Sequence, residues 1–144
     1  STCCIDARAS MQHVDALLAR EATRGIPPER QFIAGFSQGG AITLSVLVRR
    51  REALAGAIAL STYLPLADLT EHEFAPAATT IPLFLAHGSL DPVVPIGLGL
   101  MSREWLTRHG FRVDWLSYPM PHSVSMDEIR HLTQWLDERL RASA

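Results

Sequence analysis

The chain has 144 residues, of which thirteen are basic and fifteen acidic, so its formal net charge is −2. This length fits a single domain, and the near balance of charge, without an obvious basic face, argues against nucleic acid as a partner. No run of 18 apolar residues occurs, so we expect no membrane span.

The first half of the chain alternates between helical and strand patterns. Apolar residues at helical spacing predict a first helix that ends before Gly25. A short apolar run at 31–36 predicts a buried strand, and a helix is expected to follow at 41–51. The run GAIALS at 56–61 predicts the second strand.

The second half continues this alternation after an irregular segment at 64–80, which we interpret as a surface excursion. The run PLFLAH at 82–87 predicts a third strand, and a helix is expected at 97–109, where Gly110 ends it. The fourth strand, at 112–118, is more polar than the others, which is typical of a position nearer the sheet edge.

The last predicted helix opens with a capping box, in which Ser125 and Glu128 stand at the S-x-x-E spacing. Its apolar residues recur at helical spacing and are expected to pack on the sheet. They are Ile129, Leu132, Trp135, Leu136 and Leu140.

Strands that alternate with helices predict an α/β fold with three layers, in which helices cover both faces of a sheet of about four parallel strands. Right-handed crossovers bring the carboxyl ends of all the strands to one edge of such a sheet. Ligands bind at that edge in open α/β sheets, so functional residues are expected just after positions 36, 61, 87 and 118.

A G-x-S-x-G motif spans 35–39, directly between a predicted strand and a predicted helix. A sharp turn there leaves Ser37 on a strained backbone and exposes its hydroxyl, and Gly35 and Gly39 remove Cβ atoms that would collide across the turn. The N–H of Gln38, at the helix start, is the expected oxyanion donor. The alternative is an ordinary glycine-rich turn with a capping serine.

Two more candidates follow later strands at the same sheet edge. Asp91 comes just after the third strand and His122 just after the fourth, which gives the chain order Ser, Asp, His. Serine needs a base because its hydroxyl is a weak nucleophile, and an aspartate can orient the histidine. The alternatives are a turn-forming Asp91 before Pro92 and a solvated loop histidine. Asp114 could compete as the acid, but its position within a strand is unfavourable.

The other histidines carry less information. His87 lies beside the expected site, where it could support the residues that carry the chemistry, but we favour the interpretation of a strand-end histidine with satisfied hydrogen bonds. Surface or structural roles are expected for His13, His72, His109 and His131. The sequence contains no metalloprotease, dinucleotide-binding or phosphate-loop motif, and we expect no metal or organic cofactor.

Cys3 and Cys4 are the only cysteines, and they are adjacent. Neighbouring cysteines rarely form a disulfide because their side chains diverge. We therefore expect two reduced thiols, which are typical of a cytoplasmic protein.

At these motifs the sequence resembles the carboxylesterase and acyl-protein thioesterase family of α/β-hydrolases. The matching strings recur in order along nearly the whole chain. They are AGFSQGGA (34–41), LAGAIALSTYLP (54–65), LAHGSLDPVVP (85–95) and YPMPHSV (118–124).

The resemblance implies a catalytic triad of Ser37, Asp91 and His122 that hydrolyses small carboxylic esters or thioesters of short to medium chain length. It also implies that Tyr63 and Leu64 belong to a loop that helps to line the acyl pocket. Relatives with a lactonase or dienelactone hydrolase activity usually carry cysteine at the position of Ser37, which disfavours that alternative.

The sequence departs from the family pattern in two places. Pro121 stands where the family usually has glycine, so the loop that carries His122 is expected to be held somewhat differently. Nothing before Ser37 resembles the His-Gly-Leu-Gly-like loop that supplies the second oxyanion N–H in the family. We therefore expect residues 1–144 to form a partial, N-terminally truncated α/β-hydrolase domain.

Two hypotheses follow from the apparent truncation. The first is an active serine esterase, and the second is a non-catalytic remnant that keeps the triad but lacks part of the oxyanion hole. In either case the strand at 31–36 would leave an open sheet edge, which we expect to recruit another strand, either from a second copy, forming a homo-oligomer, or from a supplied N-terminal fragment.

Overall fold

The computed structural model describes residues 2–67, 69–70 and 72–142, with side chains from residue 7 onward. The thiols of Cys3 and Cys4 therefore lie outside the described part. The helices and strands are, in chain order, α1 (Thr2–Thr23), β1 (Phe32–Phe36), α2 (Gln38–Arg49), β2 (Gly56–Leu60), β3 (Leu83–Gly88), α3 (Ile96–Arg108), β4 (Val113–Tyr118) and α4 (Met126–Ala142). Two short 3₁₀ helices occur at Pro28–Arg30 and Pro76–Thr80.

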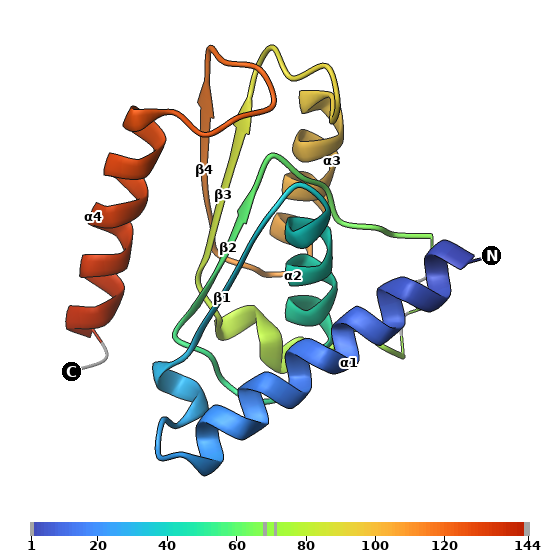
Figure 1. The fold of residues 1–144 in the computed structure, drawn as a ribbon, viewed down its shortest axis with the longest axis vertical. Coiled ribbons are helices and arrows are strands. Elements are labelled where there is room, and N and C mark those ends of the chain that lie inside the picture. The colour runs from blue at the N-terminus through green and yellow to red at the C-terminus, as the bar shows by residue number, and fades with distance from the viewer. Residues whose placement is uncertain (1, 68, 71, 143–144) are drawn as a thin grey trace.

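The four strands form one parallel sheet in the order β1-β2-β3-β4. In Figure 1, α1, α2 and α3 lie on one face of this sheet and α4 on the other. The predicted three-layer α/β fold is therefore confirmed. The more polar strand, β4, is at an edge as predicted, and β1 is the other edge strand among the described residues.

Alternating side chains of the strands divide the core into two clusters, one on each face. On the face of α1–α3, the cluster includes Ala57, Ala59 and Leu85, whereas Ile58 and Phe84 belong to the cluster beneath α4. The central strands β2 and β3 are buried along their whole length, because helices cover both of their faces.

The boundaries of α2 in the structure differ from the predicted ones. This helix begins at Gln38 and ends at Arg49, whereas the sequence predicted 41–51. Its second and third residues, Gly39 and Gly40, have a low helix propensity, so the pattern did not show the true start of the helix directly after the sharp turn at Ser37. Arg50 has an extended backbone, with φ −75° and ψ 121°, so the helix stops before it.

The segment at 64–80, predicted to be a surface excursion, is partly buried. Its residues 68 and 71 lie outside the described part. Ala75 and Ala78 are buried in the core, and the N–H of Ala75 donates to the Val48 carbonyl at 2.9 Å. The ring of Phe74 packs edge-on against Trp105, with 5.7 Å between centroids. Small apolar side chains here let the chain pack closely over α2.

The apolar stripe of α4 packs on the sheet only in its middle. Trp135 is buried, and Leu132 and Leu136 pack partly against the same cluster. Ile129 and Leu140 are 44% and 51% exposed, so the prediction is wrong for these two. The reason is that α4 lies alone on its face of the sheet among the described elements (Figure 1). No helix in the described ranges has both the length and the apolar character that crossing a membrane requires.

Only half of the predicted capping box forms at the start of α4. The Ser125 hydroxyl accepts the N–H of Glu128 at 3.1 Å, but neither carboxyl oxygen of Glu128 makes a hydrogen bond. The Glu128 side chain is instead fully buried. Burial raises the pKa of Glu128 above its ordinary value of 4.5, and the nearby Ser125 backbone opposes this only in part.

A buried carboxyl with a raised pKa makes stability depend on pH. The contribution of the protonated carboxyl to the free energy of unfolding is complete below the ordinary pKa. It is lost as the pH rises through the folded-state pKa, because the charged form is disfavoured only in the folded protein. We expect Glu128→Gln to gain stability relative to the wild type as the pH rises from 4.5 towards neutrality, because the glutamine amide cannot ionise in its buried position. Urea unfolding at several pH values measures this difference.

The matched control is Glu104→Gln, which removes an exposed carboxylate from α3. Its stability difference from the wild type is expected to stay nearly constant over the same pH range. If the Glu128→Gln difference is equally constant, the carboxyl of Glu128 does not titrate as its burial requires.

Candidate active site

Ser37 lies on the tight turn that joins β1 to α2. Its backbone has φ 56° and ψ −118°, a left-handed conformation that is strained for a residue with a side chain. A Cβ atom at Gly35 would collide with the backbone of Gly39 and Gly40, which confirms why glycine is needed there. The same prediction is wrong for Gly39, where an added Cβ would meet nothing within 4 Å.

Asp91 lies in the turn that follows β3, and its side chain is held from two sides. Its Oδ1 accepts the backbone N–H groups of Val93 at 2.8 Å and Val94 at 2.9 Å. Burial alone would raise the pKa of Asp91, but these two N–H groups and the hydrogen bond from His122 outweigh it and hold the pKa below its ordinary value of 3.8. The carboxylate is therefore ionised at neutral pH, with Oδ2 left to face the histidine.

His122 follows β4 and joins the other two residues. Its Nδ1 lies 2.6 Å from Oδ2 of Asp91, and its Nε2 lies 2.9 Å from Oγ of Ser37. Because the carboxylate can only accept, Nδ1 carries the proton and Nε2 is free to accept the serine hydroxyl. The ring of Phe36 contacts the imidazole, with 4.8 Å between centroids.

Close packing of the strand ends sets these distances. A Cβ atom at Gly88, the last residue of β3, would collide with the carbonyl groups of Met120 and Pro121. Glycine thus lets the loop that carries His122 approach the end of β3. With Pro121 in this loop, His122 still reaches both Ser37 and Asp91.

The structure brings the three residues into one hydrogen-bonded chain from three separate strand ends. Such a chain can take the proton of the serine hydroxyl onto Nε2 while the carboxylate stabilises the imidazolium that forms. The imidazole is 17% exposed, so it remains accessible to a substrate. The arrangement is suited to nucleophilic attack by Ser37 on an electrophilic carbonyl.

The remaining predicted site residues lie nearby. Gln38 is the first residue of α2, and the first N–H groups of a helix have no partner within it. Tyr63 is 40% exposed, whereas Leu64 is only 3% exposed, and its N–H donates to the Ser102 hydroxyl at 2.8 Å. A direct contact with an acyl chain is therefore better suited to Tyr63, and the roles of Gln38, Tyr63 and Leu64 stay predictions.

The other acidic and histidine residues considered for the site make their contacts outside it. Asp114 accepts the indole N–H of Trp135 at 2.8 Å, which fixes α4 against β4. His131 lies 2.8 Å from the Tyr118 hydroxyl, and His109 stacks on Trp105 with 3.7 Å between ring centroids. None of these three residues contacts the Ser37–His122–Asp91 chain.

The prediction for His87, satisfied hydrogen bonds, is confirmed for Nε2 and wrong for Nδ1, which is buried without a hydrogen-bond partner. His87 is fully buried at the end of β3, and its Nε2 lies 2.7 Å from the Val94 carbonyl and 3.7 Å from Oδ2 of Asp91. The available signal was its place four residues before Asp91, in a strand that is otherwise apolar.

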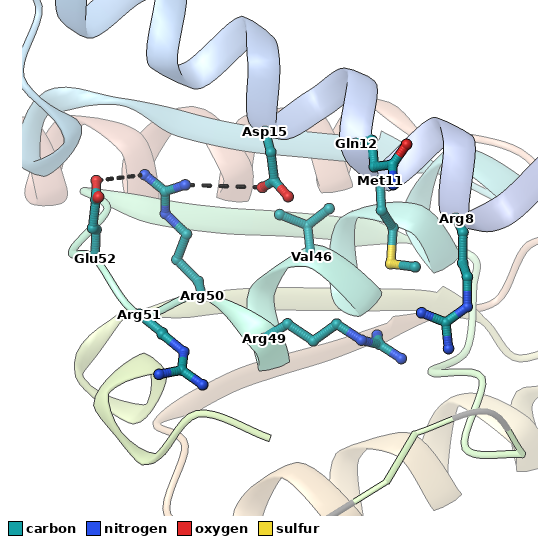
Figure 2. A pocket seen from close by; sticks show the side chains of 9 residues that line it. All are labelled: Arg8, Met11, Gln12, Asp15, Val46, Arg49, Arg50, Arg51 and Glu52. Carbon is teal, nitrogen blue, oxygen red and sulfur yellow. Dashed lines mark hydrogen bonds and ion pairs between the residues drawn. The ribbon is translucent and has the colours of Figure 1, made fainter. Parts of the chain in front are cut away.

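A cavity of about 360 Å³ lies between α1 and the C-terminal end of α2, whereas Ser37 lies just before the N-terminal end of α2. Figure 2 shows its arginine side chains, with Arg50 between Asp15 and Glu52. Arg49 donates to Glu73 at 2.9 Å. The Arg50–Asp15 pair links α1 to the residue after α2, and the carboxylates of Asp15, Glu52 and Glu73 offset most of the positive charge around the cavity.

Comparison with known proteins agrees with this geometry. Residues 5–140 match the phospholipase/carboxylesterase family of the α/β-hydrolases. Acyl-protein thioesterase 1 from Neurospora crassa is 41% identical over 91% of this chain and 55% of its own length. A probable carboxylesterase from Oryza sativa subsp. japonica is 34% identical over 93% of this chain and 51% of its own length.

Solved structures give the same result. The crystal structure of SOBER1 from Arabidopsis thaliana superposes with a TM-score of 0.85 and 29% identity, over 93% of this chain and 64% of that chain. Acyl-protein thioesterase 2 from Zea mays gives a TM-score of 0.79 and 28% identity, over 93% and 64%. The chain spans about half the length of the curated relatives above. Because the family model matches residues 5–140, this chain belongs to the phospholipase/carboxylesterase family.

Proposed function

We propose that this chain carries the catalytic part of a serine carboxylesterase that hydrolyses short- to medium-chain carboxylic esters or thioesters. The observation that carries the proposal is the hydrogen-bonded chain from Ser37 Oγ through His122 to Asp91, at 2.9 Å and 2.6 Å. Two relatives are named for carboxylesterase and acyl-protein thioesterase activity, which supports this substrate class.

The proposed reaction has two halves. Oγ of Ser37 attacks the substrate carbonyl while Nε2 of His122 takes the hydroxyl proton, and the imidazolium then returns that proton to the departing alcohol or thiol. Water next attacks the acyl-serine by the same route, which releases the acid and restores Ser37. The N–H of Gln38, at the positive end of the α2 dipole, supports the negative oxygen of each tetrahedral intermediate.

Several finer expectations belong to the same proposal. Tyr63 contacts the acyl chain, and Leu64 holds the loop beneath it through the core. We also propose a cytoplasmic location, which the expected reduced thiols of Cys3 and Cys4 support. That residues 1–144 form a partial domain stays a prediction.

A fluorophosphonate probe tests the nucleophile directly, because it forms a stable bond only with an activated serine. We expect one adduct, located on Ser37 by peptide mass mapping, together with turnover of a p-nitrophenyl ester. An adduct on Ser61, Ser89 or Ser123 would contradict the assignment. Lack of both labelling and turnover would favour the alternative of a non-catalytic remnant.

We also propose that the open edge of β1 pairs with the same strand of a second copy. Among the described strands, β1 pairs only with β2, and its Ala34 and Phe36 are exposed. A groove of about 350 Å³ runs between this strand and α1, and one of about 460 Å³ lies between α1 and α2 beside Ala34; Val14 lines both. An unpaired edge beside apolar walls favours the addition of a strand.

Light scattering at several concentrations tests this assembly. We expect the wild type to reach a mass of about two chains, and Ala34→Lys to shift it to one chain, because a charge on the edge blocks strand pairing. Ser117→Lys, which places the same charge on the other edge strand, β4, is expected to leave the mass unchanged. A wild type that stays monomeric at high concentration would exclude this mode of assembly.

A further inference from the structure

A second histidine, His87, lies in β3 just before the turn that carries Asp91. Its Nε2 lies 2.7 Å from the carbonyl oxygen of Val94, while the N–H of the same Val94 donates to Oδ1 of Asp91 at 2.9 Å. The backbone of one residue, Val94, is therefore bonded to the histidine through its carbonyl and to the carboxylate through its N–H. This links His87 to the acid through a single residue.

The hydrogen bond also determines where the proton of His87 lies. A carbonyl oxygen only accepts, so Nε2 must carry the hydrogen. The other ring nitrogen, Nδ1, is buried and has no hydrogen-bond partner. The hydrogen bond to Val94 is therefore the only side-chain hydrogen bond that the described structure gives His87.

The surroundings hold the ring in this orientation. A Cβ atom at Gly99 of α3 would lie 2.7 Å from Nδ1, so only glycine leaves room for the ring. Trp115 of β4 lies nearly parallel to the imidazole, with 6.4 Å between centroids. The histidine is thus packed between α3 and β4, and its Nε2–H lies 3.7 Å from Oδ2 of Asp91.

We propose that His87 is a positioning residue for the acid of the triad, and the proposal rests on the proposed function of Ser37, His122 and Asp91. By holding the Val94 carbonyl, His87 fixes the turn whose N–H groups hold Oδ1 of Asp91. Oδ2 then keeps the direction in which it meets Nδ1 of His122.

A matched pair of substitutions isolates the hydrogen bond from the packing. In His87→Gln, the side-chain amide can still donate to the Val94 carbonyl, whereas His87→Met has a similar length and no donor. We expect His87→Met to lower kcat by about 10- to 100-fold with little change in KM, as loss of a group that orients a functional side chain commonly does. His87→Gln is expected to restore most of this loss.

A second measurement does not need catalysis. The proton on Nδ1 of His122, hydrogen-bonded to Asp91, is expected to give a far-downfield signal in the proton NMR spectrum. This signal should persist in His87→Gln and weaken or vanish in His87→Met. If His87→Met does not fold, His87→Asn, whose shorter amide does not reach the Val94 carbonyl, serves in its place.

The control is His109→Leu, which removes another ring-to-carbonyl hydrogen bond, to Trp105 at 2.7 Å, from an exposed histidine outside the site. It is expected to change neither kcat nor the signal. Equal kcat and equal signals in the Gln and Met variants would overturn the positioning role. An inactive wild type whose signal still depends on His87 would instead refute the proposed function and leave the positioning role intact.

Discussion

Replacing Ser37 by alanine is expected to lower kcat for a p-nitrophenyl ester by about 10⁶-fold, or to the rate of the uncatalysed reaction, as loss of the nucleophile does in a well-studied serine protease. The reason is that Ser37 Oγ is the atom that we propose forms the acyl bond. Steady-state kinetics with the purified variant, corrected for spontaneous hydrolysis, measure the effect.

Ser123→Ala is the matched control, because it removes a hydroxyl from the residue next to His122 without touching the chain of hydrogen bonds. It is expected to retain activity close to that of the wild type. Alanine has a Cβ like serine, so the backbone at position 37 stays strained in Ser37→Ala. The melting temperature of the variant should therefore stay near that of the wild type. Residual turnover within tenfold of the wild type would mean that another group is the nucleophile.

Replacing Asp91 by asparagine is expected to lower kcat by about 10⁴-fold, the size of the effect that the equivalent change has in a serine protease. An amide that donates through Nδ2 toward Nδ1 of His122 favours the wrong tautomer, with the proton on Nε2, and Nε2 then cannot accept the hydroxyl of Ser37. The loss should appear in kcat, with KM little changed.

Asp114→Asn separates this effect from the general loss of a carboxylate. Asp114 accepts the Trp135 indole N–H, and an asparagine oxygen can do the same, so activity should be retained. If Asp91→Asn costs less than tenfold and Asp114→Asn costs more, Asp114 is the acid. The pKa of Asp91 is held below its ordinary value, so the carboxylate is charged throughout the neutral range in which these rates are measured.

Prediction from sequence succeeded for the order of the elements and for the strand-end residues. Short apolar runs bounded by glycine and proline mark buried strands whatever their neighbours are, and parallel topology then gathers their carboxyl ends at one edge. The G-x-S-x-G pattern was informative because it requires a backbone turn that only glycine at position 35 permits. For these reasons Ser37, Asp91 and His122 could be selected before their distances were available.

Prediction was weaker wherever the outcome depended on a partner from another element. Glu128 matched a capping box, but its side chain is buried beneath α4 instead of closing that box. Ile129 and Leu140 matched an apolar stripe, yet they are exposed because a helix buries only the residues that another element covers. Periodicity specifies which residues share a face, and it does not specify what covers that face.

The sequence by itself therefore determined the parallel α/β architecture and the three residues of the candidate triad, because both follow from local patterns and from the handedness of the chain. Only the tertiary structure decided how those residues are held. The bonds from Val93 and Val94 to Asp91, and from His87 to Val94, join backbone groups whose directions depend on how a turn folds. Such directions are set when α3, β3 and β4 pack together, and no spacing of residue types encodes them.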